Sequence, residues 1–191
     1  MKLSHVEAAV LVGGASSRMG RDKATLVYRG EPLALCAVRA LEQCVERVRL
    51  VGKPGELPDL GVACIVDRRP ERASLIGVHA ALAACEASAV LVSACDLPEI
   101  EPRLVLALLA LAPVESVYDA VAPVGPSGPE PLLAIYRPRL LPELERRIEA
   151  GEFALRALLA DAKTLLVPER ELRALDPELR SLRNLNRPED L

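Results

Sequence analysis

The sequence predicts an α/β fold of three layers, in which helices cover both faces of a Rossmann-like, mostly parallel sheet. Short apolar runs alternate with longer amphipathic stretches along the chain, and this order is typical of parallel sheets. Hydrophobic residues make up 51% of the 191 residues, which is enough for a substantial core. This length suits one domain better than two. We therefore expect a single domain over residues 1–191.

The first half of the chain supplies the clearest alternation. Val6–Val12 is an apolar run that is interrupted by Glu7 and ends at Gly13, which predicts a buried strand. Pro32–Val45 predicts a helix, because proline is tolerated in a first turn and apolar residues recur on one face. The alternation continues through strands at Val48–Val51 and Val62–Val66, a helix at Leu75–Cys85, a strand at Ala89–Ser93 and a helix at Pro102–Leu111.

The rhythm changes in the second half of the chain. Two strand-like runs, Val117–Pro123 and Leu132–Tyr136, are separated by a segment rich in glycine and proline. After them we expect helices near Pro138–Ala150 and Phe153–Leu159 and one more strand at Lys163–Val167. A second half that departs from strict alternation often covers a ligand site and binds a second substrate.

The composition excludes several classes of function. The net charge is −3, aromatic residues make up 2% and tryptophan is absent, so a basic surface and stacking platforms for nucleic acid are both lacking. The N-terminal apolar run is too short for a signal peptide or a membrane span. The five cysteines show no Cys-x-x-Cys spacing, which predicts buried small residues in a reducing cytoplasm instead of a metal site or disulfides.

The segment Leu11–Lys23, with the sequence LVGGASSRMGRDK, is the strongest candidate for a binding loop. It follows the first predicted strand, and ligands of parallel sheets bind beyond the carboxyl ends of the strands. Gly13 and Gly14 allow the backbone to approach a phosphate closely, and Arg18 and Lys23 supply positive charge. The segment predicts a loop that binds the phosphates of a nucleoside triphosphate. A β-turn with a basic flank is the alternative.

Two familiar phosphate-binding motifs do not fit this loop. A P-loop has four residues between its glycines, followed at once by Lys-Ser or Lys-Thr. Here five residues separate Gly14 from Gly20, and Arg21 and Asp22 precede Lys23. The dinucleotide pattern Gly-x-Gly-x-x-Gly does not occur. The loop therefore points to a different class of nucleotide-binding protein.

Asp96 is a candidate metal ligand. It follows the predicted strand Ala89–Ser93, so it belongs at the same sheet edge as the glycine-rich loop. A carboxylate there suits Mg²⁺, which a triphosphate needs for charge neutralisation. A helix N-cap just before Pro98 is the alternative for this residue.

The tail holds both asparagines of the chain, Asn184 and Asn186, which stand two residues apart. In a strand they would share one face. Each amide is both donor and acceptor, which suits hydrogen bonding to a polar ligand. A strand cap is the alternative.

The loop resembles the molybdenum cofactor guanylyltransferases, within the glycosyltransferase-A-like nucleotidyltransferases. The matching positions are Gly13, Gly14, Ser16, Arg18, Met19, Gly20, Asp22 and Lys23. The resemblance extends to Cys95, Asp96 and Pro98, to the strand-like run Pro131–Tyr136, and to the tail residues Asn184, Asn186, Pro188, Glu189 and Asp190. The sequence departs from the family at Ala73 and Ser74, where Gly-Pro is usual.

The resemblance implies transfer of GMP from GTP to the terminal phosphate of the molybdenum-pterin cofactor. It implies Mg²⁺ on Asp96, and catalytic roles for Lys23, Arg18 and Asp96. The implied nucleotide-binding residues are Leu11, Val12, Gly13, Gly14, Lys23, Asp67 and Asp96, and the implied acceptor-binding residues are Asn184 and Asn186. Proteins that deliver or receive the cofactor are expected partners, whereas nucleic acid and membranes are not.

Three alternatives remain open from the sequence. The first is a related nucleotidyltransferase that uses CTP or another phosphorylated acceptor. The second is a GTP-binding regulatory module without transfer chemistry, against which the missing Lys-Ser or Lys-Thr pair argues. The third is a non-catalytic scaffold that binds no nucleotide.

Overall fold

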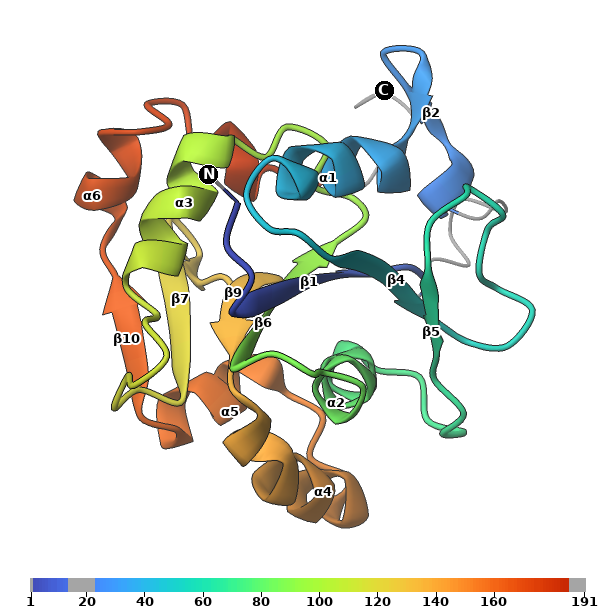
Figure 1. The fold of residues 1–191 in the computed structure, drawn as a ribbon. Coiled ribbons are helices and arrows are strands. Elements are labelled where there is room, and N and C mark those ends of the chain that lie inside the picture. Colours follow the sequence, from blue (N-terminus) through green and yellow to red (C-terminus); the bar gives the residue numbers. More distant parts are fainter. Residues whose placement is uncertain (1, 14–22, 186–191) are drawn as a thin grey trace.

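A computed structural model describes residues 2–13 and 23–185 of the chain (Figure 1). Within these residues a central sheet of eight strands has the order β10-β7-β9-β6-β1-β4-β5, and β8 pairs with the outer part of β7. The strands are β1 Val6–Leu11, β4 Val48–Gly52, β5 Cys64–Val66, β6 Ala89–Ala94, β7 Ala120–Gly125, β8 Gly128–Pro129, β9 Leu133–Tyr136 and β10 Thr164–Val167. The sheet is continuous from the first half of the chain to the second.

Most of the sheet is parallel. β1 pairs in parallel with β4 on one side and β6 on the other, and β4 pairs in parallel with β5. β9 runs antiparallel to both of its neighbours, β6 and β7, so β7 and its parallel partner β10 point the same way as β1. The predicted α/β fold with a mostly parallel sheet is confirmed.

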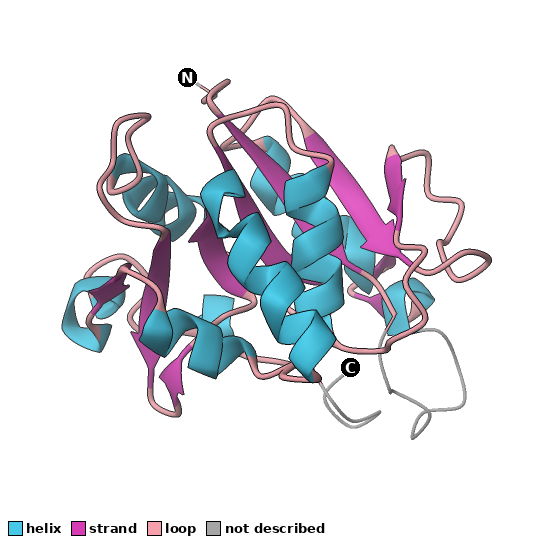
Figure 2. Ribbon diagram, turned by 90° about the horizontal axis from the view of Figure 1, so that it is seen from below, coloured by secondary structure: helices cyan, strands magenta, loops and turns pink. Residues whose placement is uncertain are grey.

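Helices cover both faces of the sheet (Figures 1 and 2). They are α1 Leu33–Glu42, α2 Ser74–Ala83, α3 Pro102–Ala110, α4 Leu141–Ala150, α5 Leu155–Asp161 and α6 Glu169–Arg173, with 3-10 turns at Lys23–Thr25, Pro138–Leu140 and Arg180–Leu182. One core cluster contains residues of α1, α3 and α6, and a second contains residues of α2, α4 and α5. Strand β1 separates them, because Ala8 and Val10 belong to the first cluster while Ala9 and Leu11 belong to the second.

Several short elements were not predicted from the sequence. A hairpin of β2 (Val27–Tyr28) and β3 (Glu31–Pro32) precedes α1, and its turn places Arg29 and Gly30 at φ of 49° and 89°. Strands of two residues have too little periodicity to be recognised in a sequence. Among the described residues, no helix is long and apolar enough to cross a membrane.

The expectation of five buried cysteines is wrong for Cys64. None of the five cysteines forms a disulfide; Cys44 and Cys95 are buried, Cys36 and Cys85 are half-buried, and Cys64 is exposed. The reason is the position of β5 at the edge of the sheet, where its side chains are not covered on both faces.

Glu7 is a charged residue in the otherwise apolar strand β1. It is only 4% exposed, yet its carboxylate is satisfied by two arginines, Arg49 and Arg47, the latter with Nη1 3.0 Å from Glu7 Oε1. Both arginines flank or belong to β4, the neighbouring strand. The charged residue that interrupts the apolar run is therefore a buried carboxylate with cationic partners. A buried carboxylate needs such partners to offset its loss of hydration.

Tyr136 is the last residue of β9, and its side chain contacts the segment that precedes this strand. Its side chain is fully buried, and its hydroxyl donates a hydrogen bond of 2.8 Å to the carbonyl of Pro131. Burial raises the pKa of the Tyr136 phenol. The hydrogen bond fixes the segment that precedes β9, which forms one wall of the cavity described below.

We expect Tyr136→Phe to lower the free energy of unfolding by about 1–2 kcal/mol at neutral pH, because the Pro131 carbonyl loses its donor. The folded protein keeps a phenolic proton that the unfolded chain loses above about pH 10. The contribution of Tyr136 is therefore complete below that pH and falls by about 1.4 kcal/mol per pH unit above it. Urea unfolding at neutral and alkaline pH measures the difference between the two proteins.

This difference should shrink as the pH rises above about 10, since phenylalanine does not titrate. Tyr118→Phe, at a half-buried tyrosine, is the matched control and should cost less at neutral pH. If the free energy of unfolding of Tyr136→Phe stayed below that of the unmutated protein by a constant amount into the alkaline range, the raised pKa of the Tyr136 phenol would be contradicted.

Candidate functional site

A large cavity lies at the carboxyl ends of the parallel strands. Its volume is about 1080 Å³, and its lining includes Gly13 after β1 and Asp96 after β6. Within the sheet, β4 neighbours β1 on one side, and the chain later returns to place β6 on the other side of β1. The strand order therefore reverses between β1 and β6, which makes their carboxyl ends a topological switch point. Open α/β sheets bind their ligands in this crevice.

Lys23 and Asp96 meet inside the cavity. Lys23 Nζ lies 2.6 Å from Asp96 Oδ2, and the two side chains are 10% and 19% exposed. Lys23 begins the 3-10 turn at Lys23–Thr25, whereas Asp96 follows β6, so residues 73 positions apart come together. The pairing holds a cation and a carboxylate at the sheet edge in a largely desolvated position.

The backbone fixes Asp96 from two directions. The N–H of Cys95 donates to the carbonyl of Leu11 at 3.1 Å, which joins the ends of β6 and β1. The N–H of Leu185 donates to the carbonyl of Asp96 at 3.0 Å, which brings the tail of the described chain to the same loop. Asp96 therefore has little freedom to leave the cavity wall.

The second oxygen of the Asp96 carboxylate suits a metal ion. Asp96 Oδ1 is buried and has no hydrogen-bond partner in the part of the chain that the structure describes. A buried oxygen without a partner calls for a ligand or an ion. Residues 2–13 and 23–185 contain no cluster of three or more histidine, cysteine or acidic side chains that could hold a metal. Mg²⁺ commonly takes only one or two protein carboxylates and completes its shell with substrate phosphates and water, so Asp96 fits that ion.

A smaller cavity of about 230 Å³ adjoins the first at Leu11 and Gly13 and contains Asp67. Asp67 follows β5 and is 6% exposed, with Oδ2 2.6 Å from Lys53 Nζ at the end of β4. Its Oδ1 accepts a 3.0 Å hydrogen bond from the backbone N–H of Arg69. The structure thus brings Asp67 beside Gly13, the residue that follows β1 by two positions.

The first turn of α2 forms the wall between these cavities. Ser74, the first residue of α2, lines both of them, and Ala73 is the N-cap. Gly77 faces Leu11 so closely that a Cβ at this position would lie 3.0 Å from both methyl groups of Leu11. Glycine is therefore favoured at position 77, where α2 packs on β1. The Gly-Pro pair that is usual at the start of this turn is replaced by Ala73 and Ser74.

The opposite wall of the larger cavity comes from the second half of the chain. It includes Glu130, Leu132, Arg156 and Asn184. Burial raises the pKa of Glu130, and the nearest cation, Arg156, lies 3.7 Å away. The tail was considered as a strand, but no strand forms in it up to residue 185. Asn184 lies in irregular backbone after a 3-10 turn, and the hydrogen bond between Leu185 and Asp96 holds this segment.

Three of the site residues expected from the sequence lie outside the described residues: Gly14, Arg18 and Asn186. Of the others, Leu11, Gly13, Lys23, Asp96 and Asn184 line the larger cavity, and Val12 and Asp67 line the smaller one. The structure thus brings the described members of the set to one edge of the sheet.

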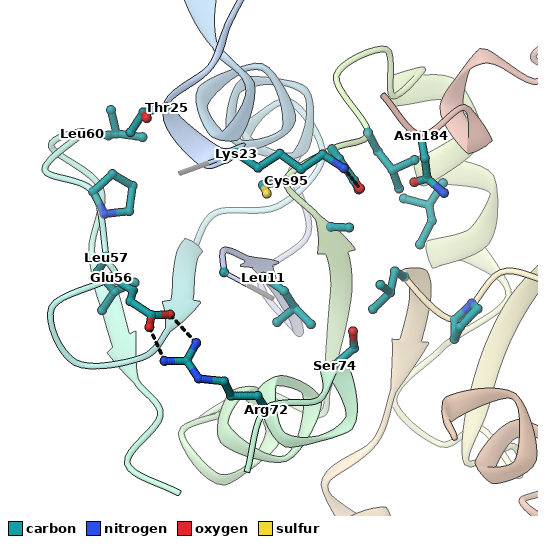
Figure 3. Close-up of a pocket in the computed structure, with 18 of the residues that line it drawn as sticks. Leu11, Lys23, Thr25, Glu56, Leu57, Leu60, Arg72, Ser74, Cys95 and Asn184 are labelled. Carbon is teal, nitrogen blue, oxygen red and sulfur yellow. Dashed lines mark hydrogen bonds and ion pairs between the residues drawn. The ribbon is translucent and has the colours of Figure 1, made fainter. Parts of the chain in front are cut away.

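Sequence reasoning missed several charged residues of these walls, namely Lys53, Glu56, Arg72, Glu130 and Arg156. Only Lys53 carried a usable signal. It follows a predicted strand directly, and it is one of only four lysines in a chain with 24 basic residues. Figure 3 shows Glu56 and Arg72 away from Lys23, and in this view Leu11 lies between Lys23 and Arg72.

Comparisons with known proteins agree with this geometry. The family described as MobA-like NTP transferase domain matches residues 8–166. A probable molybdenum cofactor guanylyltransferase of Chloroflexus aggregans is 38% identical over 190 residues, covering 95% of this chain and 89% of the relative. Another protein of that description, from Deinococcus radiodurans, is 35% identical over 185 residues, covering 96% of this chain and 91% of the relative.

Solved structures show the same fold. Molybdopterin-guanine dinucleotide biosynthesis protein A from Archaeoglobus fulgidus superposes with a TM-score of 0.82 at 28% identity, covering 96% of this chain and 94% of that one. A 2-C-methyl-D-erythritol 4-phosphate cytidylyltransferase from Thermus thermophilus gives a TM-score of 0.69 at 19% identity over 100% of this chain and 95% of that one. The latter similarity is one of fold.

The buried pair of Asp67 and Lys53 generates a prediction about stability. Asp67→Ala leaves the Lys53 ammonium in a position where its side chain is only 15% exposed, without its carboxylate. We expect the free energy of unfolding to fall by about 3 kcal/mol in urea titrations. The double variant Asp67→Leu with Lys53→Met removes both charges and should recover much of the loss. Equal losses in the single and double variants would show that the charge pairing is not the cause.

Proposed function

We propose that this chain, which belongs to the MobA-like NTP transferase family, transfers GMP from GTP to the terminal phosphate of the molybdenum-pterin cofactor. The products are the guanine dinucleotide form of the cofactor and pyrophosphate. The names of the similar proteins from Chloroflexus aggregans and Deinococcus radiodurans support this substrate pair.

The observation that carries the proposal is the meeting of Lys23 and Asp96 in the crevice between β1 and β6. A nucleotidyl transfer needs a cation near the triphosphate and a carboxylate that can hold a divalent metal. Lys23 supplies the first, and Asp96, whose Oδ1 is buried without a partner among the described residues, supplies the second. Both lie where an open α/β sheet binds its ligand.

The proposed reaction makes modest demands on the protein. An oxygen of the acceptor phosphate forms a bond to the α-phosphorus of GTP, while the bond from that phosphorus to the oxygen bridging to the β-phosphate breaks. The electron pair of the broken bond leaves with pyrophosphate. Because the acceptor phosphate is already anionic, no general base is required. Catalysis then consists of positioning the two substrates and neutralising their charge.

Each expected site residue has a role in this proposal. Lys23 and Arg18 stabilise the negative charge that develops on the leaving pyrophosphate, and Asp96 holds Mg²⁺. When bound, Mg²⁺ neutralises charge on the triphosphate. The nucleoside end of GTP is held by Asp67 and by the backbone of the glycine-rich loop at Leu11, Val12, Gly13 and Gly14.

The acceptor is proposed to bind on the wall supplied by the second half of the chain. Asn184 lines the cavity there, and Asn186 follows it by two residues in the sequence. Their amides can donate to and accept from the edge of a pterin. We further propose that residues 1–191 act as one nucleotidyltransferase domain in the cytoplasm, with cofactor-delivering proteins or molybdoenzymes as its partners.

The direct test is to incubate the protein with GTP, Mg²⁺ and the molybdenum-pterin cofactor and to look for the guanine dinucleotide product and pyrophosphate. Parallel reactions with CTP and ATP measure the base preference. Formation of a cytosine dinucleotide at the higher rate would overturn the guanine assignment. GTP binding with slow hydrolysis and no pyrophosphate release would instead indicate a regulatory GTP-binding protein.

Lys23→Ala should reduce turnover by about 100- to 1000-fold, because it removes a cation aimed at the charge that forms in the transition state. The midpoint of thermal unfolding should fall as well, because Asp96 loses the partner of a largely desolvated pair, so turnover is compared at a temperature at which both proteins are folded. Lys163→Ala, at an exposed lysine outside the cavity, is the matched control and should retain activity. Full turnover in Lys23→Ala would remove this residue from the proposed mechanism.

Asp96→Asn should abolish the dependence of nucleotide binding on Mg²⁺. In the unmutated protein, GTP with Mg²⁺ should raise the thermal unfolding midpoint more than GTP with a chelator. The variant should show the same small shift in both conditions, because an amide is a poor ligand for this ion. Glu178→Gln, at an exposed carboxylate paired with Arg180, serves as the control. A Mg²⁺-dependent shift that survives in Asp96→Asn would place the metal elsewhere.

A further inference from the structure

Glu56 and Arg72 form a doubly hydrogen-bonded pair where the larger and smaller cavities adjoin. Arg72 Nη2 donates to Glu56 Oε1 at 2.5 Å, and Arg72 Nη1 donates to Glu56 Oε2 at 3.2 Å (Figure 3). Glu56 lies in the loop after β4, and Arg72 lies just before α2. Both residues line both cavities. The pair therefore stands inside the candidate site.

The carboxylate of Glu56 lies close to Gly13. A Cβ built on Gly13, whose φ is +88°, would come within 3.2 Å of Glu56 Oε2. The N–H of Glu56 also donates to the carbonyl of Lys53 at 3.1 Å, which ties the glutamate to the end of β4. Glu56 is thus held against the backbone that the proposed function assigns to the nucleoside end of GTP.

The position of the base follows from the position of the phosphates. If the triphosphate lies at Lys23 and Asp96, the nucleoside must extend toward the other end of the larger cavity. Figure 3 shows Arg72 and Ser74 on the opposite side of Leu11 from Lys23, and Glu56 beside Leu11, paired with Arg72. A nucleotide lying across Leu11 therefore brings its base toward the Glu56 carboxylate.

The chemistry of the pair identifies the base. The hydrogen bonds from Arg72 lower the pKa of Glu56, so the side chain is a carboxylate that only accepts hydrogen bonds. Arg72 offers it two parallel N–H donors from one planar N–C–N unit. Guanine carries the same unit on its Watson–Crick edge, where N1–H and the 2-amino group are adjacent donors. Adenine and cytosine each have an acceptor nitrogen beside the amino group, and uracil has one N–H between two carbonyls.

We propose that Glu56 selects guanine by accepting hydrogen bonds from N1–H and the 2-amino group, and that Arg72 occupies this place in the nucleotide-free protein until the base displaces it. This inference rests on the proposed use of GTP. Displacement is feasible because the Arg72 side chain is 57% exposed, and an exposed ion pair contributes little to stability. Once a bound nucleotide shields the Glu56 carboxylate from water, the carboxylate discriminates between bases more strongly than an exposed one. A base that places an acceptor atom there repels the carboxylate and leaves it without a hydrogen-bond donor.

The test compares the binding of GTP, ITP and ATP, each with Mg²⁺, to the unmutated protein and three variants by isothermal titration calorimetry. ITP is the informative probe, because it keeps N1–H and lacks only the 2-amino group. The unmutated protein should bind GTP about 10- to 100-fold more tightly than ITP. Glu56→Gln should bring the two affinities within a few-fold of each other, mainly by weakening GTP. Arg72→Ala should tighten GTP binding, because it removes the internal competitor.

Glu178→Gln is the control, since it alters an exposed glutamate paired with Arg180 outside both cavities and should leave all affinities unchanged. A GTP-to-ITP ratio that persists in Glu56→Gln would overturn the role of Glu56. Weaker GTP binding in Arg72→Ala would overturn the role of Arg72 as competitor and would indicate that it contacts the nucleotide directly. A lack of preference for GTP in the unmutated protein would instead refute the proposed function on which the inference rests.

Discussion

Leu11 at the end of β1 and Ala94 at the end of β6 are in register on adjacent parallel strands, and the site is organised around this pair of strand ends. Because the two strands end together, Gly13 and Asp96 emerge at the same edge of the sheet. The hydrogen bond from Cys95 to the Leu11 carbonyl extends the contact one step past the strands. A change in the register of these strands by one residue would reverse the faces of their side chains and separate the loop from the carboxylate.

Three cations of the site are paired with carboxylates in the nucleotide-free protein. Lys23 lies against Asp96, Lys53 against Asp67 and Arg72 against Glu56. Pairing stabilises side chains that would otherwise be costly to keep in partly buried positions. In the proposed reaction, an incoming triphosphate would compete with these carboxylates for the cations, and Asp96 could hold a divalent metal once Lys23 contacts phosphate.

Much of the fold could be predicted because it depends on patterns that the chain repeats. The buried run at Val6–Val12 and the proline-led helix at Pro32–Val45 correspond to β1 and α1 to within a few residues. The common position of Lys23 and Asp96 could be predicted because Asp96 follows one strand and Lys23 ends the glycine-rich segment that follows another, and the directions of both strands follow from the alternation. The cysteine in β5 was misjudged because the sequence does not tell an edge strand from a central one.

The remaining site residues could not be predicted because loops position them. Glu56 and Arg72 belong to irregular segments, and their contact depends on how β4, β5 and α2 pack in three dimensions. Asn184 was expected to contribute through a strand, but a single backbone hydrogen bond to the Asp96 loop holds its segment. Single tertiary contacts of this kind leave no periodic trace in a sequence.

The hydrogen bond from Leu185 to Asp96 also has a consequence for folding during synthesis. Strands β1, β4, β5 and β6 can pair once the ribosome has translated somewhat beyond Ala94, since each neighbours another in the sheet. The wall that contains Leu182 and Asn184 cannot form until translation has passed Leu185 and that segment has left the exit tunnel. A nascent chain thus acquires the sheet edge that carries Asp96 well before the surface that completes the cavity. Premature capture of a ligand by this intermediate is limited, because one side of its cavity is still open to water.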